Sequence, residues 1–172
     1  IKTEVIFVEN DADFINKKTV NKLLIENKMD VRSIAKEDLN LNKLENSINN
    51  NPMVDKAEVY VTVDGVLKAI VKQKAPIARV FDSVGTYYLD NEGNTMPLSG
   101  LNTARVPLVL GEISSKNRKK LAQVLRVINK DPFLKKNIIG VELDANDDLK
   151  MTNRNFDFQI DFGGTINVDR KI

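Results

Sequence analysis

The hydrophobic periodicity of this chain changes near Pro76, and that change limits the fold to a mixed α and β architecture. Before Pro76, apolar residues recur at helical spacing in two segments, residues 14–27 and 40–52. After Pro76, short apolar runs separated by turn residues are typical of β-strands. Single cores usually serve about 100 to 150 residues, so a chain of 172 residues can form two small units. We therefore predict an α+β fold with two domains, residues 1–75 and residues 76–172.

The first domain is expected to fold in the order strand, helix, helix, strand, strand. Residues 2–8 are rich in β-branched and aromatic side chains and end at a polar cluster, which indicates a strand. The second helical segment follows Asn40 or Asn42, either of which can cap it, and it stops at Pro52. The pattern therefore predicts a β-α-α-β-β unit.

The last two strands of this unit flank Asp64 and Gly65. This dipeptide favours tight hairpins because both residues tolerate a positive φ. A two-residue loop would place Val61 opposite Lys68, an apolar side chain beside a charged one on the same face. We therefore expect a bulge or a wider turn at this point.

The second domain is expected to be rich in β-strands and to contain one helix. The helix, residues 114–130, carries an apolar stripe, can be capped by Ser114 or Ser115, and ends at Asp131 and Pro132. Strands are expected at residues 77–83, 86–90, 94–99, 104–111, 137–144, 149–155, 156–163 and 165–172. The helix should pack on the sheet that these strands form.

The segment 156–163 has the clearest strand pattern. Its apolar residues alternate with Asp157, Gln159 and Asp161. Such alternation predicts a strand with one buried face and one face in water. The apolar residues are Phe156, Phe158, Ile160 and Phe162.

The chemistry that the sequence can support is limited, because the chain contains His 0 and Cys 0. Ser-His and Cys-His nucleophiles and most zinc sites are therefore excluded. Alternate polar residues from Asp144 onward resemble a calcium loop, but Leu149 stands where Gly is needed and Asn155 where Glu is needed. A solvated hairpin turn is the expected structure there. We predict no catalytic residue, no metal site and no cofactor.

The net charge of the chain does not indicate a class of binding partner. A net charge of +2 is too small to direct the chain to nucleic acid or to anionic lipid. The basic run from Lys116 to Lys120 is expected to be the solvated face of the helix. No apolar run approaches the roughly 20 residues that cross a bilayer.

The helical segment 41–48, the step Pro52-Met53-Val54, the step Pro76-Ile77-Ala78 and the turn at residues 89–93 follow one another in a recognisable order. In these motifs the chain resembles the bacterial cell-division family FtsQ, called DivIB in Gram-positive bacteria, and most closely its Bacteroides-like branch. The resemblance covers the whole chain, densely from residue 39 to residue 112 and loosely beyond. The POTRA domain of that family has a helix like residues 41–48, followed by a step like Pro52-Met53-Val54. A step like Pro76-Ile77-Ala78 then leads into the second domain, where residues 89–93 match a family hairpin. The order and spacing of these motifs make the resemblance specific.

The resemblance implies a non-enzymatic divisome scaffold that binds FtsB and FtsL at the septum. It implies a protein on the periplasmic face of the inner membrane, anchored by a single N-terminal helix that this chain lacks. In the family, a closing helix and strands follow the equivalent of residue 172, and the final strands are the main surface for FtsB and FtsL. The resemblance also places the strand 57–63 at a sheet edge, where Glu58, Tyr60 and Thr62 would bind a partner strand.

Two other functions are consistent with parts of the sequence. A POTRA module of an outer-membrane assembly or secretion protein would show repeated POTRA units or a barrel, and one unit followed by a different β domain argues against it. An enzyme acting on cell-wall glycan through carboxylates or lysines would need a deep cleft lined by paired acidic residues.

Overall fold

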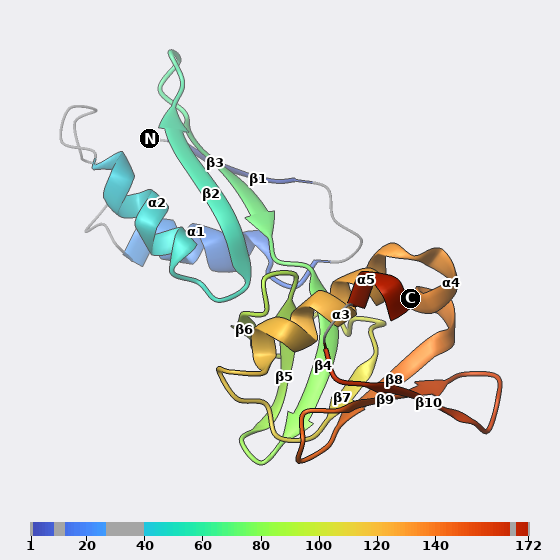
Figure 1. The fold of residues 1–172 in the computed structure, drawn as a ribbon. Coiled ribbons are helices and arrows are strands. Elements are labelled where there is room, and N and C mark those ends of the chain that lie inside the picture. The colour runs from blue at the N-terminus through green and yellow to red at the C-terminus, as the bar shows by residue number, and fades with distance from the viewer. Residues whose placement is uncertain (1, 9–12, 27–39, 166–167, 172) are drawn as a thin grey trace. The chain divides into compact units, whose positions relative to one another are not determined.

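The protein forms two compact units, the first made of residues 1–74 and 99–103 and the second of residues 75–98 and 104–172. A computed structural model gives their structure (Figure 1). It describes residues 2–8, 13–26, 40–165 and 168–171.

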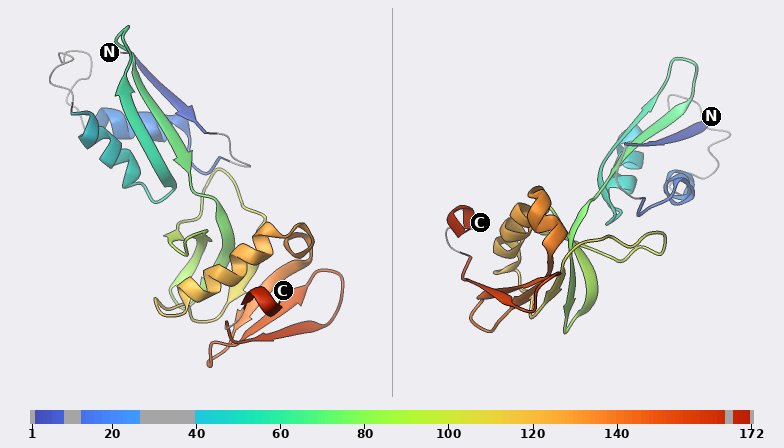
Figure 2. Two further views of the ribbon diagram at one scale, coloured as in Figure 1. Left: turned by 45° about the horizontal axis from the view of Figure 1, so that its top comes forward. Right: turned by 90° about the vertical axis from the view of Figure 1, so that its right-hand side faces the viewer.

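The first unit is a three-stranded sheet with two helices on one face (Figures 1 and 2). The central strand is β3 (Leu67–Gln73), which pairs with β1 (Thr3–Phe7) in parallel and with β2 (Val54–Val61) antiparallel. The helices are α1 (Lys17–Glu26) and α2 (Leu41–Asn49). This element order confirms the predicted β-α-α-β-β unit.

Local signals explain where α2 begins and which face it buries. The Asn40 side-chain oxygen accepts the N–H of Lys43 at 2.9 Å, which confirms Asn40 as the cap. Leu44 and Ile48, one helical turn apart, are both buried. The apolar stripe read from the sequence is therefore the face that packs on the sheet.

The β2–β3 hairpin has the wider turn that the sequence predicted. Val61 lies opposite Leu67, so apolar side chains are paired there. The Gly65 N–H donates to the Thr62 carbonyl at 2.9 Å, and Gly65 has a φ of 81°. The Thr62 N–H in turn donates to the Val66 carbonyl at 2.9 Å, which gives a three-residue loop with a glycine bulge.

Residues 99–103 belong to the first unit although they follow β6 in the chain. The Ser99 hydroxyl donates to the Phe14 carbonyl at 2.8 Å, and the Asn102 side-chain amide donates to the Asp13 carbonyl at 2.7 Å. No periodicity in the sequence indicates this placement, because these hydrogen bonds join segments that are far apart in the chain.

The second unit is a seven-stranded mixed sheet with the order β10-β9-β8-β7-β4-β5-β6. The pairs β4–β7 and β7–β8 are parallel, and the other four are antiparallel. The strands are β4 (Pro76–Asp82), β5 (Gly85–Asp90), β6 (Thr95–Met96), β7 (Leu108–Leu110), β8 (Ile138–Leu143), β9 (Leu149–Asn153) and β10 (Gln159–Gly163). The helices are α3 (Arg118–Lys130), α4 (Pro132–Asn137) and α5 (Val168–Lys171).

The core of the second unit lies between α3 and one face of this sheet (Figure 2). Four residues of α3 are at most 1% exposed and pack against buried residues of the central strands. They are Leu121, Val124, Leu125 and Ile128. The predicted packing of this helix on the sheet is confirmed.

α3 begins at Arg118, four residues after the predicted start, and a second helix, α4, follows its end. The Ser114 hydroxyl accepts the Asn117 N–H at 3.3 Å, and the Asn117 side-chain oxygen accepts the Ser114 N–H at 2.8 Å, so Ser114 caps the turn that leads into α3 as predicted. At the other end, the Asp131 carboxylate accepts the N–H groups of Phe133 and Leu134 at 2.8 and 2.9 Å. Asp131 therefore caps α4, so the residue that ends one helix begins the next.

The predicted strand 156–163 is correct only in its second half. β10 begins at Gln159, while Phe156 and Phe158 are 59% and 53% exposed and stack with their ring centroids 5.3 Å apart. The register pairs Gln159 with Thr152, and β9 ends one residue later, so no paired strand among the described residues lies beside Phe156. Phe162 is buried as predicted.

The predicted strand 165–172 is wrong, because residues Val168–Lys171 form the short helix α5. The Lys171 ammonium group donates to the carbonyls of Phe162 and Gly164 at 3.0 and 2.8 Å. It also lies 5.0 Å from the centre of the Phe162 ring. These contacts hold the helical turn against the end of β10.

Candidate interaction surfaces

The outer edge of β2 carries the residues predicted to bind a partner strand. β2 lies at an edge of its sheet, as the resemblance implied. Glu58 and Tyr60 are exposed, and Thr62 follows the end of the strand. The Glu58 carboxylate lies 2.7 Å from the Lys56 ammonium group, and this hydrogen bond lowers the pKa of Glu58 and raises the pKa of Lys56.

Two backbone N–H groups along this edge are already hydrogen-bonded. The Val59 N–H donates to the Glu45 carboxylate at 3.1 Å, and the Ala57 N–H donates to the Asn49 side-chain oxygen at 2.7 Å. Alternate residues of an antiparallel edge strand direct their N–H groups away from the sheet, and these two belong to that set. An incoming strand would have to displace both α2 side chains. Partner binding by Glu58, Tyr60 and Thr62 stays a prediction.

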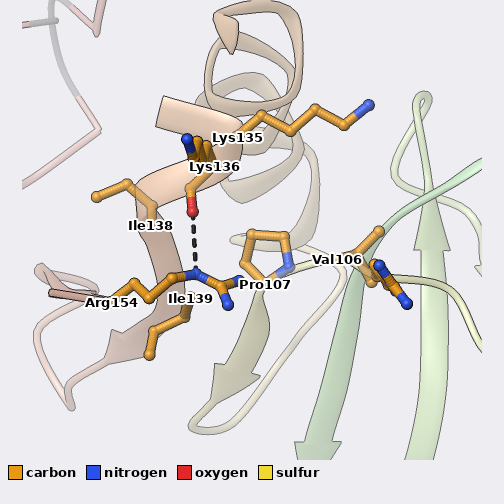
Figure 3. A pocket seen from close by; sticks show the side chains of 8 residues that line it. Val106, Pro107, Lys135, Lys136, Ile138, Ile139 and Arg154 are labelled. Carbon is orange, nitrogen blue, oxygen red and sulfur yellow. Dashed lines mark hydrogen bonds between the residues drawn. The ribbon is translucent and has the colours of Figure 1, made fainter. Parts of the chain in front are cut away.

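A groove of about 650 Å³ lies in the second unit beside the end of α4 (Figure 3). The sequence did not predict it, because its residues come from three separate segments. Half of them are cationic and half are apolar. They are Arg105, Val106, Pro107, Lys135, Lys136, Ile138, Ile139 and Arg154.

Arg154 is held in the groove by two hydrogen bonds to the end of α4. Its Nε donates to the Lys136 carbonyl at 3.1 Å, drawn as the dashed line in Figure 3, and its backbone N–H donates to the Asn137 carbonyl at 2.8 Å. The two terminal guanidinium nitrogens form no hydrogen bond with the residues that the structure describes. These nitrogens can therefore receive a carboxylate or another anion.

The electrostatics of the groove favour an anionic ligand. Within the described ranges no carboxylate lines it, and none of its four cationic side chains forms an ion pair. Ile138 and Pro107 are buried beneath it, whereas Ile139 is 39% exposed. Positive side chains around an apolar floor suit a ligand that presents both a carboxylate and an apolar side chain.

An exposed aromatic surface lies beside the edge strand β10. β10 is one edge of the seven-stranded sheet, and the stacked pair Phe156 and Phe158 comes just before it. Exposed aromatic side chains beside an unpaired strand edge are typical of protein-binding surfaces. This pair was detected in the sequence, but as a buried face.

The remaining candidate motifs serve local structure. The Asp144 carboxylate accepts the N–H groups of Asn146 and Asp148 at 2.7 and 3.0 Å, which confirms the predicted hairpin turn. Across the described part of the chain, no group of three or more acidic side chains is placed to hold a metal ion. Within the same residues, no helix has the length and apolar character needed to span a membrane.

Two family models match the chain and together cover most of it. A model described as FtsQ/DivIB, C-terminal related, matches residues 75–172, which is more than half of the sequence. The chain belongs to the FtsQ/DivIB C-terminal related family. It therefore has a role in cell division, within a family of scaffold type rather than a known class of enzyme. A POTRA-like domain matches residues 5–72, so the predicted family resemblance and α+β fold class are confirmed.

Among solved structures, the chain is similar to the major extracytoplasmic domain of the trans isomer of the cell-division protein DivIB from Geobacillus stearothermophilus. The match has 12% sequence identity and a TM-score of 0.43, and it covers 57% of this chain and 85% of that one. No curated protein matches the chain.

Proposed function

We propose that this chain is the partner-binding part of a non-enzymatic division scaffold, which binds FtsB and FtsL at the septum. The proposal places it on the periplasmic face of the inner membrane, with a single N-terminal helix of the full-length protein as its anchor. The observation that carries it is the match of residues 75–172 to the FtsQ/DivIB family. In this proposal residues 1–75 and residues 76–172 act as separate interaction modules.

The basic groove is the surface of the second module that we assign to the division partner. Its four cations attract an acidic segment from a distance, which raises the association rate. The terminal guanidinium nitrogens of Arg154 then bind one carboxylate, and the exposed side chain of Ile139 contacts a neighbouring apolar side chain. Apolar burial supplies affinity, and the charges supply orientation.

Calorimetric titration with a soluble FtsB–FtsL complex from the same bacterium tests this proposal. The double variant Lys135→Glu with Lys136→Glu should weaken binding at least about tenfold, because two attractive charges become repulsive. Lys119→Glu with Lys120→Glu is the matched control, since both side chains are exposed on another helix and the change in net charge is equal. Equal affinities for the two double variants would exclude the groove. No binding by the unaltered protein would exclude the partners.

A further inference from the structure

The two edges of the three-stranded sheet differ in whether their backbone is free. At β2 the outward N–H groups of Ala57 and Val59 are bonded to α2 side chains. The opposite edge is β1, which pairs only with β3 among the described strands. A strand edge accepts a new strand only where its N–H and C=O groups are unpaired.

The hydrogen bonds of β1 show which of its residues face away from the sheet. The Leu67 N–H donates to the Lys2 carbonyl at 2.8 Å, and the Val8 N–H donates to the Val71 carbonyl at 3.0 Å. A parallel strand uses every second residue for this pairing, so the even-numbered residues face β3. The outward set is Thr3, Val5 and Phe7.

Thr3, Val5 and Phe7 have no hydrogen bond on their outward side to any residue that the structure describes. Among the described residues, three N–H and C=O pairs are therefore left without a partner at intervals of two residues. An added strand presents its own backbone groups at the same interval. The edge thus offers up to three matched positions to an extended peptide.

A hollow of about 410 Å³ runs along this edge. It is lined by residues 4–8 and by Asp13 and Lys17. The Glu4 carboxylate in this lining lies 3.2 Å from the Lys68 ammonium group. The Asp13 carboxylate already accepts the Gln73 amide at 3.0 Å, whereas Lys17 is exposed and pairs with no described acidic residue. Ile6 and Val8 are 37% and 44% exposed on the face of the sheet away from the helices.

We propose that the β1 edge, and not the β2 edge, accepts an extended segment of a partner protein. Alternate apolar side chains of that segment would extend the apolar surface of Ile6 and Val8, and a carboxylate would reach Lys17. A second copy of β1 fits less well. Antiparallel pairing of two β1 strands centred on Val5 would place Glu4 of one copy opposite the apolar Ile6 of the other. Glu4 already lies 3.2 Å from Lys68 of its own chain.

The probe for this proposal is a synthetic peptide, Glu-Val-Thr-Val-Thr-Val-Thr with blocked ends, added to the isotope-labelled full chain. Nuclear magnetic resonance should show slower amide exchange at Thr3, Val5 and Phe7 and no change at Ala57 and Val59. Two further peptides carry N-methyl groups on alternate backbone nitrogens, one at odd positions and the other at even positions. Each of these peptides therefore lacks the N–H donors along one of its own two edges. Only one of the two should lose affinity, by about tenfold or more, because an added strand uses one edge.

A variant at Thr3 tests the role of the β1 backbone N–H separately from the role of the side chain. Thr3→Pro removes an outward N–H but leaves the pairing with β3, and it should weaken peptide binding up to about tenfold. Thr3→Val keeps the N–H and should bind as the unaltered chain does.

Protection at Ala57 and Val59, equal affinity of both methylated peptides, or no binding at millimolar peptide would overturn the proposal. Slower amide exchange at Thr3, Val5 and Phe7 that appears without peptide as the protein concentration rises would show that a second copy pairs with this edge. That result would overturn the proposal of a partner segment.

Discussion

The N–H of Val59 donates across 3.1 Å to the carboxylate of Glu45, a residue of the helix that covers the sheet. The same helix therefore covers one face of the three-stranded sheet and satisfies the backbone of its β2 edge. Asn49, one helical turn later, does the same for Ala57. Because these bonds occupy two outward N–H groups of β2, β1 is the more accessible edge among the residues that the structure describes.

Replacement of Glu45 by alanine should destabilise the protein and expose the β2 edge. A hydrogen bond to a charged acceptor contributes about 1.5–3 kcal/mol, so we expect the free energy of unfolding to fall by about 1–2 kcal/mol once water replaces part of the bond. The amide of Val59 should exchange faster. Urea denaturation and hydrogen exchange measure the two effects. Glu58→Ala, an exposed change on the adjacent strand, should alter neither, and equal effects of both variants would contradict the assignment.

Gly111 should tolerate no side chain. Its φ of 116° lies in a region that favours glycine, and an added Cβ would overlap the carbonyl oxygen of Leu143. We expect Gly111→Ala to lower the free energy of unfolding by about 2–4 kcal/mol, as measured by urea denaturation. Gly100→Ala is the control, because an added Cβ at Gly100 meets no atom within 4 Å. Its effect should stay within about 0.5 kcal/mol.

Tyr87 should make the stability of the protein fall in alkali. Burial, together with a 2.6 Å hydrogen bond from its hydroxyl to the Asp82 carboxylate, raises the pKa of Tyr87 above its ordinary value. The folded protein thus holds this proton more tightly than the unfolded chain. The stabilisation is complete below the tyrosine pKa of about 10 in the unfolded state and is lost as the pH rises above it.

Denaturation midpoints across this pH range, with phenolate absorbance as a second readout, measure that loss. Tyr87→Phe should make the alkaline decline in stability shallower. Tyr60→Phe, which removes a hydroxyl from a 41% exposed side chain, should keep the decline of the unaltered protein. An unchanged alkaline decline in Tyr87→Phe would contradict the role of Tyr87.

The sequence predicted the first unit well because its local signals agree with its tertiary structure. Asn40 caps α2 as expected, and the glycine of Asp64-Gly65 supplies the positive φ of the hairpin. The mismatch of Val61 with Lys68 in a two-residue loop correctly indicated the wider turn. Propensity, capping and pairing all favoured one structure at these positions.

Features that depend on contacts between distant segments could not be predicted. Alternation at Phe156 and Phe158 indicated a buried face, but burial also requires a paired neighbour, and β9 ends too early to supply one. The groove combines Arg105 with Arg154, which are far apart in the sequence and share no periodic pattern. The bond from Val59 to Glu45 likewise follows from packing and not from either residue's propensity.

Cell length in the native bacterium tests the central claim most directly. The chromosomal gene is replaced by one encoding Lys135→Glu with Lys136→Glu, and a second strain carries the control pair Lys119→Glu with Lys120→Glu. With both variants present at equal protein levels, the account predicts filaments with few septa in the first strain and cells of ordinary length in the second. Ordinary cell length and septum frequency in both strains would contradict a division function exerted through the groove.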